Sequence, residues 1–240
     1  MPTQYKHVTQ EIVQHLFPEK NSLRNVNKHF TAVRKALEKY GLTSPELQLV
    51  AYATIRAESA AFAPIIERES KFNTRYANGI EIPVEFNGGG IVNTEISWDG
   101  TIIPKKRIKI NLYEGRSSPK DLGNTALGDG VNYMGRGFVQ LTGKVRYKLY
   151  GDILGENLVE NPDLALDPDI AAKLLALYIS YNRPQIERAL KKGDLKAARK
   201  AVNGGSNGLD KFIEAFNKGK KLIEPKIEQV PLKQKHINLP

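Results

Sequence analysis

Three glutamates between positions 58 and 69 are the residues best suited to acid–base chemistry. Glu58 follows Leu47 by eleven residues in a segment of helical spacing, so it lies near the apolar, inward side of that helix. A carboxylate on such a face is costly unless it is paired, hydrogen-bonded or kept protonated. Two interpretations follow: Glu58 forms a salt bridge with Arg56 or Arg68, or it serves as a general acid.

Glu67 and Glu69 belong to a different element from Glu58. Pro64 interrupts the chain between them, and the segment that follows is polar and has little period. The carboxylates can therefore face each other across a cleft. Opposed carboxylates are what hydrolysis of a glycosidic bond requires, because one group protonates the leaving oxygen while the other activates water.

The helix that must position Glu58 has clear start and stop signals. Ser44 is a good N-cap, Pro45 suits the first helical position, and Glu46 suits the positive end of the helix dipole. The segment 60–64 ends the helix. Upstream, residues 8–17 and 25–40 carry helical spacing, and Gly41 is expected to terminate the second of these helices.

The stretch from Gly128 to Tyr150 holds five glycines in 23 positions. Such glycine density beside Tyr133, Phe138 and Tyr147 indicates a backbone brought close to something, with aromatic walls next to it. A buried glycine-rich turn followed by an ordinary helix is the alternative. Gly135-Arg136-Gly137 is too short to be a phosphate-binding loop, and the stretch contains no GxxxxGK(S/T) pattern.

The remaining segments predict a mainly α protein with a small β-hairpin insertion. Residues 79–112 alternate apolar and polar residues, with a hairpin turn at Asp99-Gly100 and with Pro83 and Pro104 confining the strands to sheet edges. Helices are expected at 170–181, 184–190, 194–202 and 209–222. We therefore expect one catalytic domain over 1–224, with N-terminal helices in 1–43 and a loosely ordered basic tail over 225–240.

Composition narrows the class of protein. The chain has 240 residues, 40% of them hydrophobic and 26% charged, and no cysteine, so disulfides and thiolate chemistry are excluded. The net charge of +10 favours a polyanionic partner. The N-terminus lacks the apolar run of a signal peptide, and no segment is apolar enough for a membrane span. Cytoplasmic storage before release to the cell wall is therefore expected. No metal site or cofactor is indicated.

Five ordered motifs between residues 45 and 217 resemble glycoside hydrolase family 19, which comprises chitinases and lysozyme-like endolysins of phages and bacteria. The motifs are Ala57-Glu58-Ser59-Ala60-Ala61-Phe62, Tyr113-Glu114-Gly115-Arg116 with Leu122-Gly123-Asn124-Thr125, Gly128 through Gly143, Asn161-Pro162-Asp163-Leu164-Ala165, and Val202-Asn203-Gly204-Gly205. The resemblance implies a mainly helical, two-lobed, lysozyme-like fold. It also implies cleavage of β-1,4 bonds between N-acetylated sugars with inversion.

The resemblance assigns roles residue by residue. Glu58 corresponds to the general acid and Glu67 to the general base, with Glu69 as a rival for the second role. Residues matching sugar- or water-binding positions are Thr142, which would hold the water, Gln140 and Asn203, which would read an N-acetyl amide, and Tyr133 and Arg136 on the cleft floor.

The chain departs from the family pattern at several positions. Ala57 replaces a His, Ala60-Ala61 replaces a Gly-Gly pair, Arg146 replaces an Asn that contacts sugar, and Lys211 replaces an Arg that supports the base. The insertion at 79–112 has no counterpart.

Two polysaccharides fit this chemistry. The basic surface and the absence of disulfides favour the anionic peptidoglycan of a bacterial wall, cut by an endolysin-type muramidase acting as a monomer. Chitin is the alternative. From other classes, a non-catalytic wall-binding protein or a nucleic-acid binder would also suit the charge, but both glutamates are present and no nucleic-acid module is recognised.

Overall fold

The computed structural model describes residues 8–68, 74–78, 90–93, 107–118, 120–126, 128–203 and 208–224. For 74–78, 90–93, 107–111 and Asn203 it describes the backbone alone. Glu69, the predicted turn at Asp99-Gly100, Pro83 and Pro104, and the tail 225–240 lie outside the described residues. The helices and strands are α1 Gln10–Leu16, α2 Lys20–Lys39, α3 Pro45–Glu58, β1 Ile65–Ile66, β2 Thr74–Asn78, β3 Gly90–Asn93, β4 Arg107–Asn111, α4 Asp129–Asn132, β5 Arg136–Gly137, α5 Lys144–Leu154, the 3-10 helix η1 Pro162–Leu166, α6 Pro168–Tyr181, α7 Arg183–Lys191, α8 Leu195–Asn203 and α9 Leu209–Ile223.

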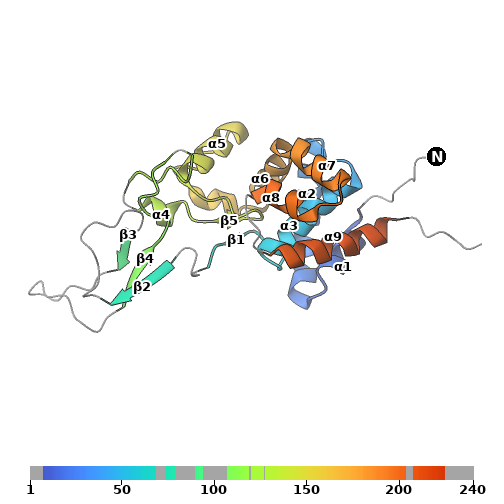
Figure 1. Cartoon of the computed structure of the whole chain (residues 1–240), viewed down its shortest axis with the longest axis horizontal. Coiled ribbons are helices and arrows are strands. Elements are labelled where there is room, and N and C mark those ends of the chain that lie inside the picture. Colours follow the sequence, from blue (N-terminus) through green and yellow to red (C-terminus); the bar gives the residue numbers. More distant parts are fainter. Residues whose placement is uncertain are drawn as a thin grey trace, which may run out of the picture.

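The elements form two lobes (Figure 1). Helices α1–α3 and α6–α9 gather in one, and α4, α5 and the three-stranded sheet lie in the other, with β1 and β5 between them. The predicted fold class, mainly α with a small β part, is confirmed. None of the helices in the described ranges combines the length and the apolar character that crossing a bilayer requires.

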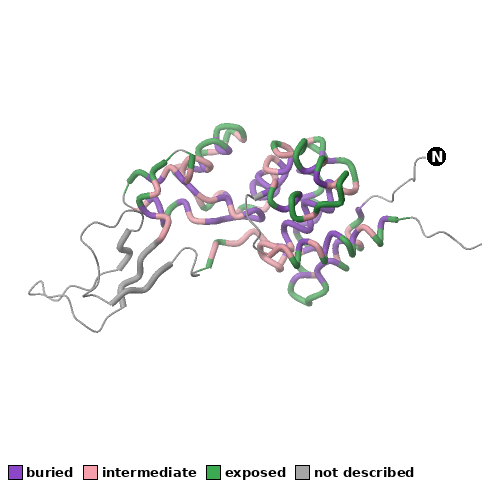
Figure 2. The backbone as a smooth tube through the Cα atoms, viewed as in Figure 1, coloured by how far each residue is buried: buried purple, intermediate pink, exposed green. Residues whose placement is uncertain are grey.

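Helix α3 lies at the centre of the larger lobe (Figure 2). Every residue from Leu47 to Ile55 is buried, and the helix packs against α1, α6, α8 and α9. Its predicted start is confirmed: the Ser44 side chain accepts a hydrogen bond from the Leu47 N–H, and Pro45 is the first helical residue. A helix buried on all sides is rigid. The backbone of Glu58, at the C-terminal end of α3, therefore has a fixed position.

Helix α2 begins at Lys20, five residues before the predicted start. The first turn is polar, so the apolar spacing that reveals a helix is visible only from Val26 onwards. The predicted end is confirmed. Gly41 has φ +72°, and the Leu42 N–H donates to the Leu37 carbonyl, as expected for a glycine-terminated helix.

The β insertion differs from its prediction. Antiparallel strands in the order β2-β4-β3 pair Thr74 with Asn111 and Gly90 with Asn111, so the sheet begins at Thr74 rather than at 79. The sequence of β2, TRYAN, has no apolar alternation to mark it as a strand. Its place is fixed by backbone hydrogen bonds to β4, which lies more than thirty residues later in the chain.

Each lobe has its own hydrophobic core, and the stretch 128–150 contributes to both. Phe138 is buried in the larger core, whereas Tyr133 and Tyr147 are buried in the smaller one, with ring centroids 5.3 Å apart. The three rings thus belong to the protein's own cores, as the alternative of a buried glycine-rich turn implies. They pack inside the protein because the glycines between them let the backbone turn from one core to the other.

His29 of α2 makes the stability of the larger lobe sensitive to acid. Its ring is buried and meets the Phe138 ring edge-on, with centroids 6.2 Å apart. Burial, with a smaller contribution from Lys28, lowers the pKa of His29 below its ordinary value of 6.5. The unfolded chain therefore binds a proton at His29 more readily than the folded protein does. As a result, the free energy of unfolding falls as the pH falls below that value.

We expect His29→Leu to reduce this pH dependence. Between about pH 7 and pH 5, urea titrations should show a smaller loss of stability in the variant than in the wild type. His15→Leu is the matched control, since His15 lies in the partly exposed last turn of α1. Parallel stability–pH curves for wild type and His29→Leu would contradict the assignment.

Candidate active site

Four of the predicted residues line one open pocket of about 810 Å³. Glu58, Glu67, Gln140 and Thr142 come from the end of α3, the end of β1 and the segment after β5. Pro64 to Arg68, Ser59, Ala61 and Leu166 complete the lining. The predicted separation of the glutamates onto different elements that share a cleft is thus what the structure shows.

Glu58 is held by a residue that sequence reasoning did not single out. Oε1 of Glu58 accepts a 2.8 Å hydrogen bond from Arg199 of α8, and the side chains of these two residues are 14% and 0% exposed. The guanidinium also lies over the Phe212 ring, 5.9 Å from its centroid. A carboxylate at the negative end of a helix dipole is unfavourable, and the buried guanidinium offsets this.

Arg56, one of the two salt-bridge partners considered for Glu58, does not pair with it. Arg56 instead forms a two-pronged pair with Glu19, at 2.6 and 2.8 Å, and lowers the pKa of Glu19 to about 2. Neighbours at i−2 point to different sides of a helix, so Arg56 cannot easily reach the carboxylate of Glu58. Arg68 lines the same pocket as Glu58.

The turn after α3 sets the path from Glu58 to Glu67. Ala60 and Phe62 have φ of +53° and +49°, a conformation that costs a residue with a side chain about 1–2 kcal/mol. Side chains of α2 hold this turn: Ser22 donates to the Ala60 carbonyl at 3.1 Å, and Asn25 donates to the Ala61 carbonyl at 2.8 Å. The Phe62 ring is buried among the rings of Phe17, Tyr52 and Phe138.

Ala60→Gly should stabilise the protein by about 0.5–1 kcal/mol, because glycine adopts a positive φ without strain. Ala61→Gly provides the control: Ala61 has no positive φ, so the same change there should lower stability. Urea unfolding of both variants measures the difference. Equal effects at the two positions would show that strain at Ala60 does not limit stability.

Glu67 is positioned by the second lobe. β1 pairs with β5, Ile66 opposite Arg136, and the Glu67 N–H donates to the Gly135 carbonyl at 2.7 Å. The Glu67 carboxylate accepts from the Tyr113 hydroxyl, at 2.9 and 3.2 Å, and from the Gly135 N–H at 3.2 Å. Burial and the nearby Glu67 charge raise the pKa of Tyr113, so its hydroxyl stays protonated and continues to donate.

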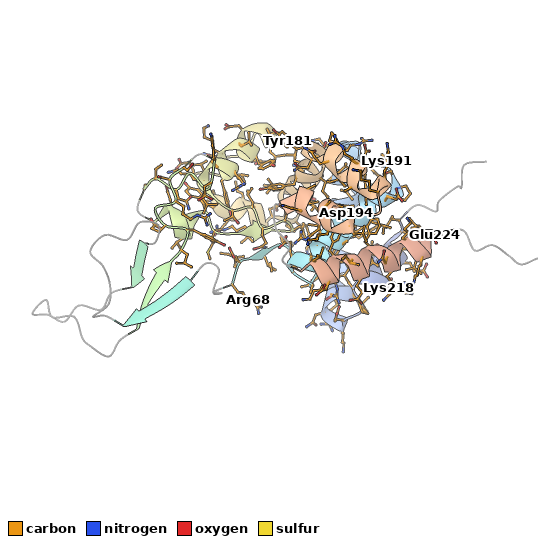
Figure 3. All side chains as sticks on the ribbon, in the orientation of Figure 1. Arg68, Tyr181, Lys191, Asp194, Lys218 and Glu224 are labelled. Carbon is orange, nitrogen blue, oxygen red and sulfur yellow. The ribbon has the colours of Figure 1, made fainter. Side chains whose placement is uncertain are left out.

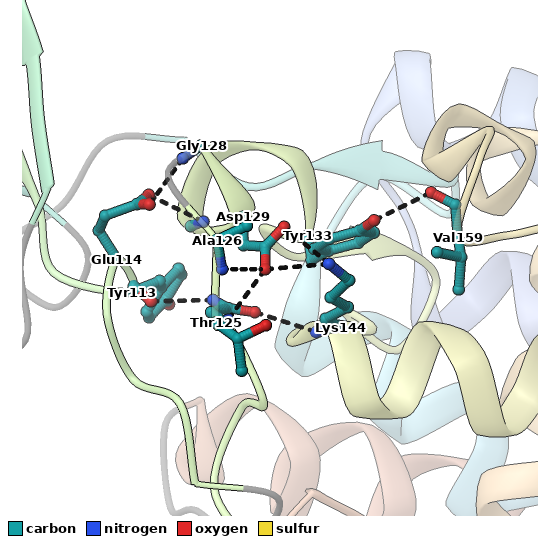
Figure 4. A network of polar contacts seen from close by, with 11 residues as sticks. Tyr113, Glu114, Thr125, Ala126, Gly128, Asp129, Tyr133, Lys144 and Val159 are labelled. Atoms are coloured by element: carbon teal, nitrogen blue, oxygen red, sulfur yellow. Dashed lines mark hydrogen bonds and ion pairs between the residues drawn. The ribbon is translucent and has the colours of Figure 1, made fainter.

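A polar network anchors the loop that carries Tyr113 (Figure 4). The Tyr113 carbonyl accepts from the Asn124 side chain at 2.8 Å. Buried Glu114 accepts from the backbone N–H groups of Gly128 and Gly130, at 2.6 and 2.9 Å. The glycines of the central stretch therefore permit contact with the protein's own carboxylate, since a Cβ on Gly130 would lie 2.6 Å from Glu114.

Gln140 and Thr142 line the same pocket as the two glutamates. Gln140 has φ +55°, and its amide donates to the carbonyls of Ile65 and Gly137 at 3.1 and 3.2 Å. The Thr142 hydroxyl donates to the Gln140 carbonyl at 2.9 Å. The side-chain oxygens of both residues, like that of Glu67, lie close to Gly135. Gly135 is thus the point around which this half of the site is packed.

Tyr133 and Arg136, predicted for the cleft floor, do not line the pocket. The Tyr133 hydroxyl donates to the Val159 carbonyl at 3.0 Å. Buried Arg136 donates to the Asp163 carboxylate and the Asn132 carbonyl, both at 2.8 Å. Their contacts join the segment 132–136 to Val159 and Asp163. Asn203 ends α8, and its side chain, like all of Glu69, lies outside what the structure describes.

Sequence reasoning missed Arg199, Gly135 and the role of Tyr113. A signal for Arg199 was present: Leu195, Ala198 and Val202 mark an apolar face with helical spacing, and Arg199 lies on it. The run of lysines around it concealed this pattern. Within the described ranges, no group of three or more His, Cys, Asp or Glu side chains could hold a metal ion.

Comparisons with known proteins find partial relatives in sequence and a similar solved fold. No family model matches the chain. Over 111 residues it is 32% identical to a glycosyl hydrolase family 19 domain-containing protein of Haemophilus influenzae, covering 45% of this chain and 52% of that protein. Over 46 residues it is 48% identical to Chitinase 11 of Oryza sativa subsp. japonica, covering 19% and 18%. The chain therefore spans about half of the first relative and less than a fifth of the second.

The fold is similar to a solved bacterial family 19 chitinase. The TM-score is 0.51 with 18% sequence identity, and the likeness covers 88% of this chain and 94% of that one. The resemblance to glycoside hydrolase family 19 is thereby confirmed, in sequence over part of the chain and in fold over most of it.

Proposed function

We propose that this protein is a glycoside hydrolase that cleaves β-1,4 bonds of an N-acetylated sugar polymer by an inverting acid/base mechanism. The observation that carries the proposal is the pairing of Glu58 and Glu67 in one pocket, each held by a different lobe and by different partners. A bound sugar would lie between them. Chitinases among the similar proteins support this substrate class.

In the proposed reaction Glu58, in its protonated form, gives its proton to the leaving glycosidic oxygen. Arg199 fixes the orientation of that carboxyl group and stabilises the carboxylate that remains afterwards. Glu67, ionised, accepts a proton from a water molecule that attacks the opposite face of the sugar. Tyr113 and the Gly135 N–H hold the Glu67 carboxylate in place.

For the substrate we favour peptidoglycan, cut by a muramidase at the bacterial cell wall. The net charge of +10 supports an anionic polymer, since opposite charges raise both the rate of encounter and the local concentration of substrate. Chitin is neutral and gains nothing from that charge. It remains the alternative because the proposed catalytic residues would act on the β-1,4 bond, which both polymers contain.

The test is a product analysis of purified peptidoglycan and of chitin oligomers, with Glu67→Gln as the inactive control. Mass spectrometry should find new muramic-acid reducing ends from the wild type, and NMR during the first minutes should find them as the α-anomer. Cleavage of chitin alone would select the alternative. A wild type that binds walls yet cuts neither polymer would refute hydrolysis.

A further inference from the structure

A second pocket of about 620 Å³ adjoins the proposed active site and shares Gln140 and Thr142 with it. We propose that this pocket binds the anionic peptide branch of a peptidoglycan strand and so selects peptidoglycan over neutral chitin. The inference rests on the proposed function, because it places the branch of a strand whose sugar lies between Glu58 and Glu67.

The pocket lies between the two lobes. Arg146, Leu149 and Tyr150 come from α5, Tyr178 and Tyr181 come from the end of α6, and Lys200 and Val202 come from α8. In Figure 1 the helix α5 faces the α6–α8 side of the larger lobe across this space. A chain that enters past Gln140 can therefore extend from the first pocket into the second.

The charge of the lining is positive. Among the residues that the structure describes, Arg146 and Lys200 are its charged members, and no carboxylate lines it. The Arg146 guanidinium donates hydrogen bonds to the carbonyls of Asp121 and Thr142, at 3.1 and 3.2 Å. Across the part of the chain that the structure describes, neither cation pairs with a carboxylate. Two cations without an internal counter-charge suit a carboxylate from outside.

The rim supplies apolar surface beside the charges. The Tyr181 side chain is 79% exposed and Leu149 is 51% exposed, which is unusual for large apolar residues that share a pocket. Tyr181 stands at the edge of the larger lobe (Figure 3). The rings of Tyr150 and Tyr178 stack at 4.6 Å and form a rigid wall. Such a surface can cover sugar rings and aliphatic parts of a peptide.

The amide side chains of Asn182 and Gln185 also line the pocket. Amides donate and accept hydrogen bonds without charge, which suits the peptide groups of a branch. Chitin offers no carboxylate to Arg146 or Lys200, so its binding would leave both cations without a partner. The pocket thus distinguishes the two polymers by charge, whereas the glutamates act on a glycosidic bond that both polymers contain.

The test compares Lys200→Glu with Lys196→Glu. Lys196 lies one turn earlier on α8, is exposed and does not line the pocket, so the two variants change the net charge equally. Affinity is measured by calorimetry in a Glu58→Gln background, which prevents cleavage. The probes are soluble peptidoglycan strands with peptide stems, the same strands after amidase treatment, and chitin oligomers.

Lys200→Glu should weaken binding of the stem-bearing strands by about fivefold relative to Lys196→Glu, the effect expected for one exposed charge pair. With Glu58 restored, the ratio of kcat/KM for peptidoglycan over chitin should fall in Lys200→Glu alone. Arg146→Gln should lower the same ratio.

The outcomes separate the two proposals. If the wild type cuts peptidoglycan but both lysine variants bind stem-bearing strands equally, the pocket inference fails and the proposed function stands. If Lys200→Glu selectively loses those strands while no polymer is cut, the pocket is supported and hydrolysis fails. Equal loss for strands with and without stems would also overturn the inference.

Discussion

Glu58→Gln is expected to lower kcat on the cleaved polysaccharide by about a thousandfold, within the range that general acid catalysis contributes. An amide cannot give a proton to the leaving oxygen. KM should change little, because the amide keeps the size of the carboxyl group and still faces the pocket. Initial-rate kinetics on soluble strands measures both constants.

The same substitution should also cost stability. Arg199 has a fully buried side chain, and Glu58 is its carboxylate partner at 2.8 Å. Replacing the carboxyl group that Arg199 contacts by an amide weakens the hydrogen bond of a buried guanidinium, and this is expected to lower the free energy of unfolding by about 1–3 kcal/mol. We therefore expect this substitution to lower both activity and stability, because Glu58 would be both a catalytic and a structural residue.

Glu46→Gln is the matched control for Glu58→Gln. Glu46 lies on the same helix and forms only a long pair of 3.7 Å with Lys220, both side chains being about 40% exposed. This change should leave kcat unaltered and shift stability by less than about 0.5 kcal/mol. If Glu58→Gln kept more than a tenth of the wild-type kcat, the general acid would have to be another residue.

Gly135→Ala should separate activity from stability. A Cβ at this position would lie 2.8 Å from Oε1 of Gln140, 3.0 Å from Oε2 of Glu67 and 3.2 Å from Oγ1 of Thr142. All three atoms are ends of flexible side chains, so the fold can absorb the methyl group. The site cannot, because a displacement of about 1 Å at catalytic groups can lower kcat about a hundredfold.

Gly219→Ala on α9 gives the opposite result. There the new methyl group would collide with Leu49, inside the larger core. Overpacking of this kind costs about 1–3 kcal/mol, while kcat per folded molecule should be unchanged. Loss of stability without loss of kcat in Gly135→Ala would show that Gly135 serves the fold alone.

The sequence was sufficient for elements whose signals are local. Ser44 and Pro45 mark the start of α3, and the motif residues Glu58, Glu67, Gln140 and Thr142 meet in one pocket as expected. It was insufficient where a contact with a distant part of the chain determines the structure of a segment. The strand β2 has no period of its own, and its pairing with β4 defines it.

The same limit applies to the groups that hold the two glutamates. Arg199 reaches Glu58 from 141 positions away, and Tyr113 reaches Glu67 from 46. A helical face can show that Arg199 points inward, but no pattern along the chain names its partner. The sequence also did not reveal that Tyr133 and Arg136 are buried, because a motif shows which residues recur but not whether they contact the ligand.

The division of the site between two cores has a consequence for cooperativity. Glu58 and Arg199 lie on α3 and α8 of the larger lobe, whereas Tyr113, which holds Glu67, follows β4 in the smaller one. The distance between the two proposed catalytic carboxylates therefore depends on how the lobes are joined. An oligosaccharide bound between the lobes would connect them a second time. By mass action such a ligand stabilises only the arrangement with both lobes folded. Saturating oligosaccharide thus makes the two lobes melt as one unit at a higher temperature.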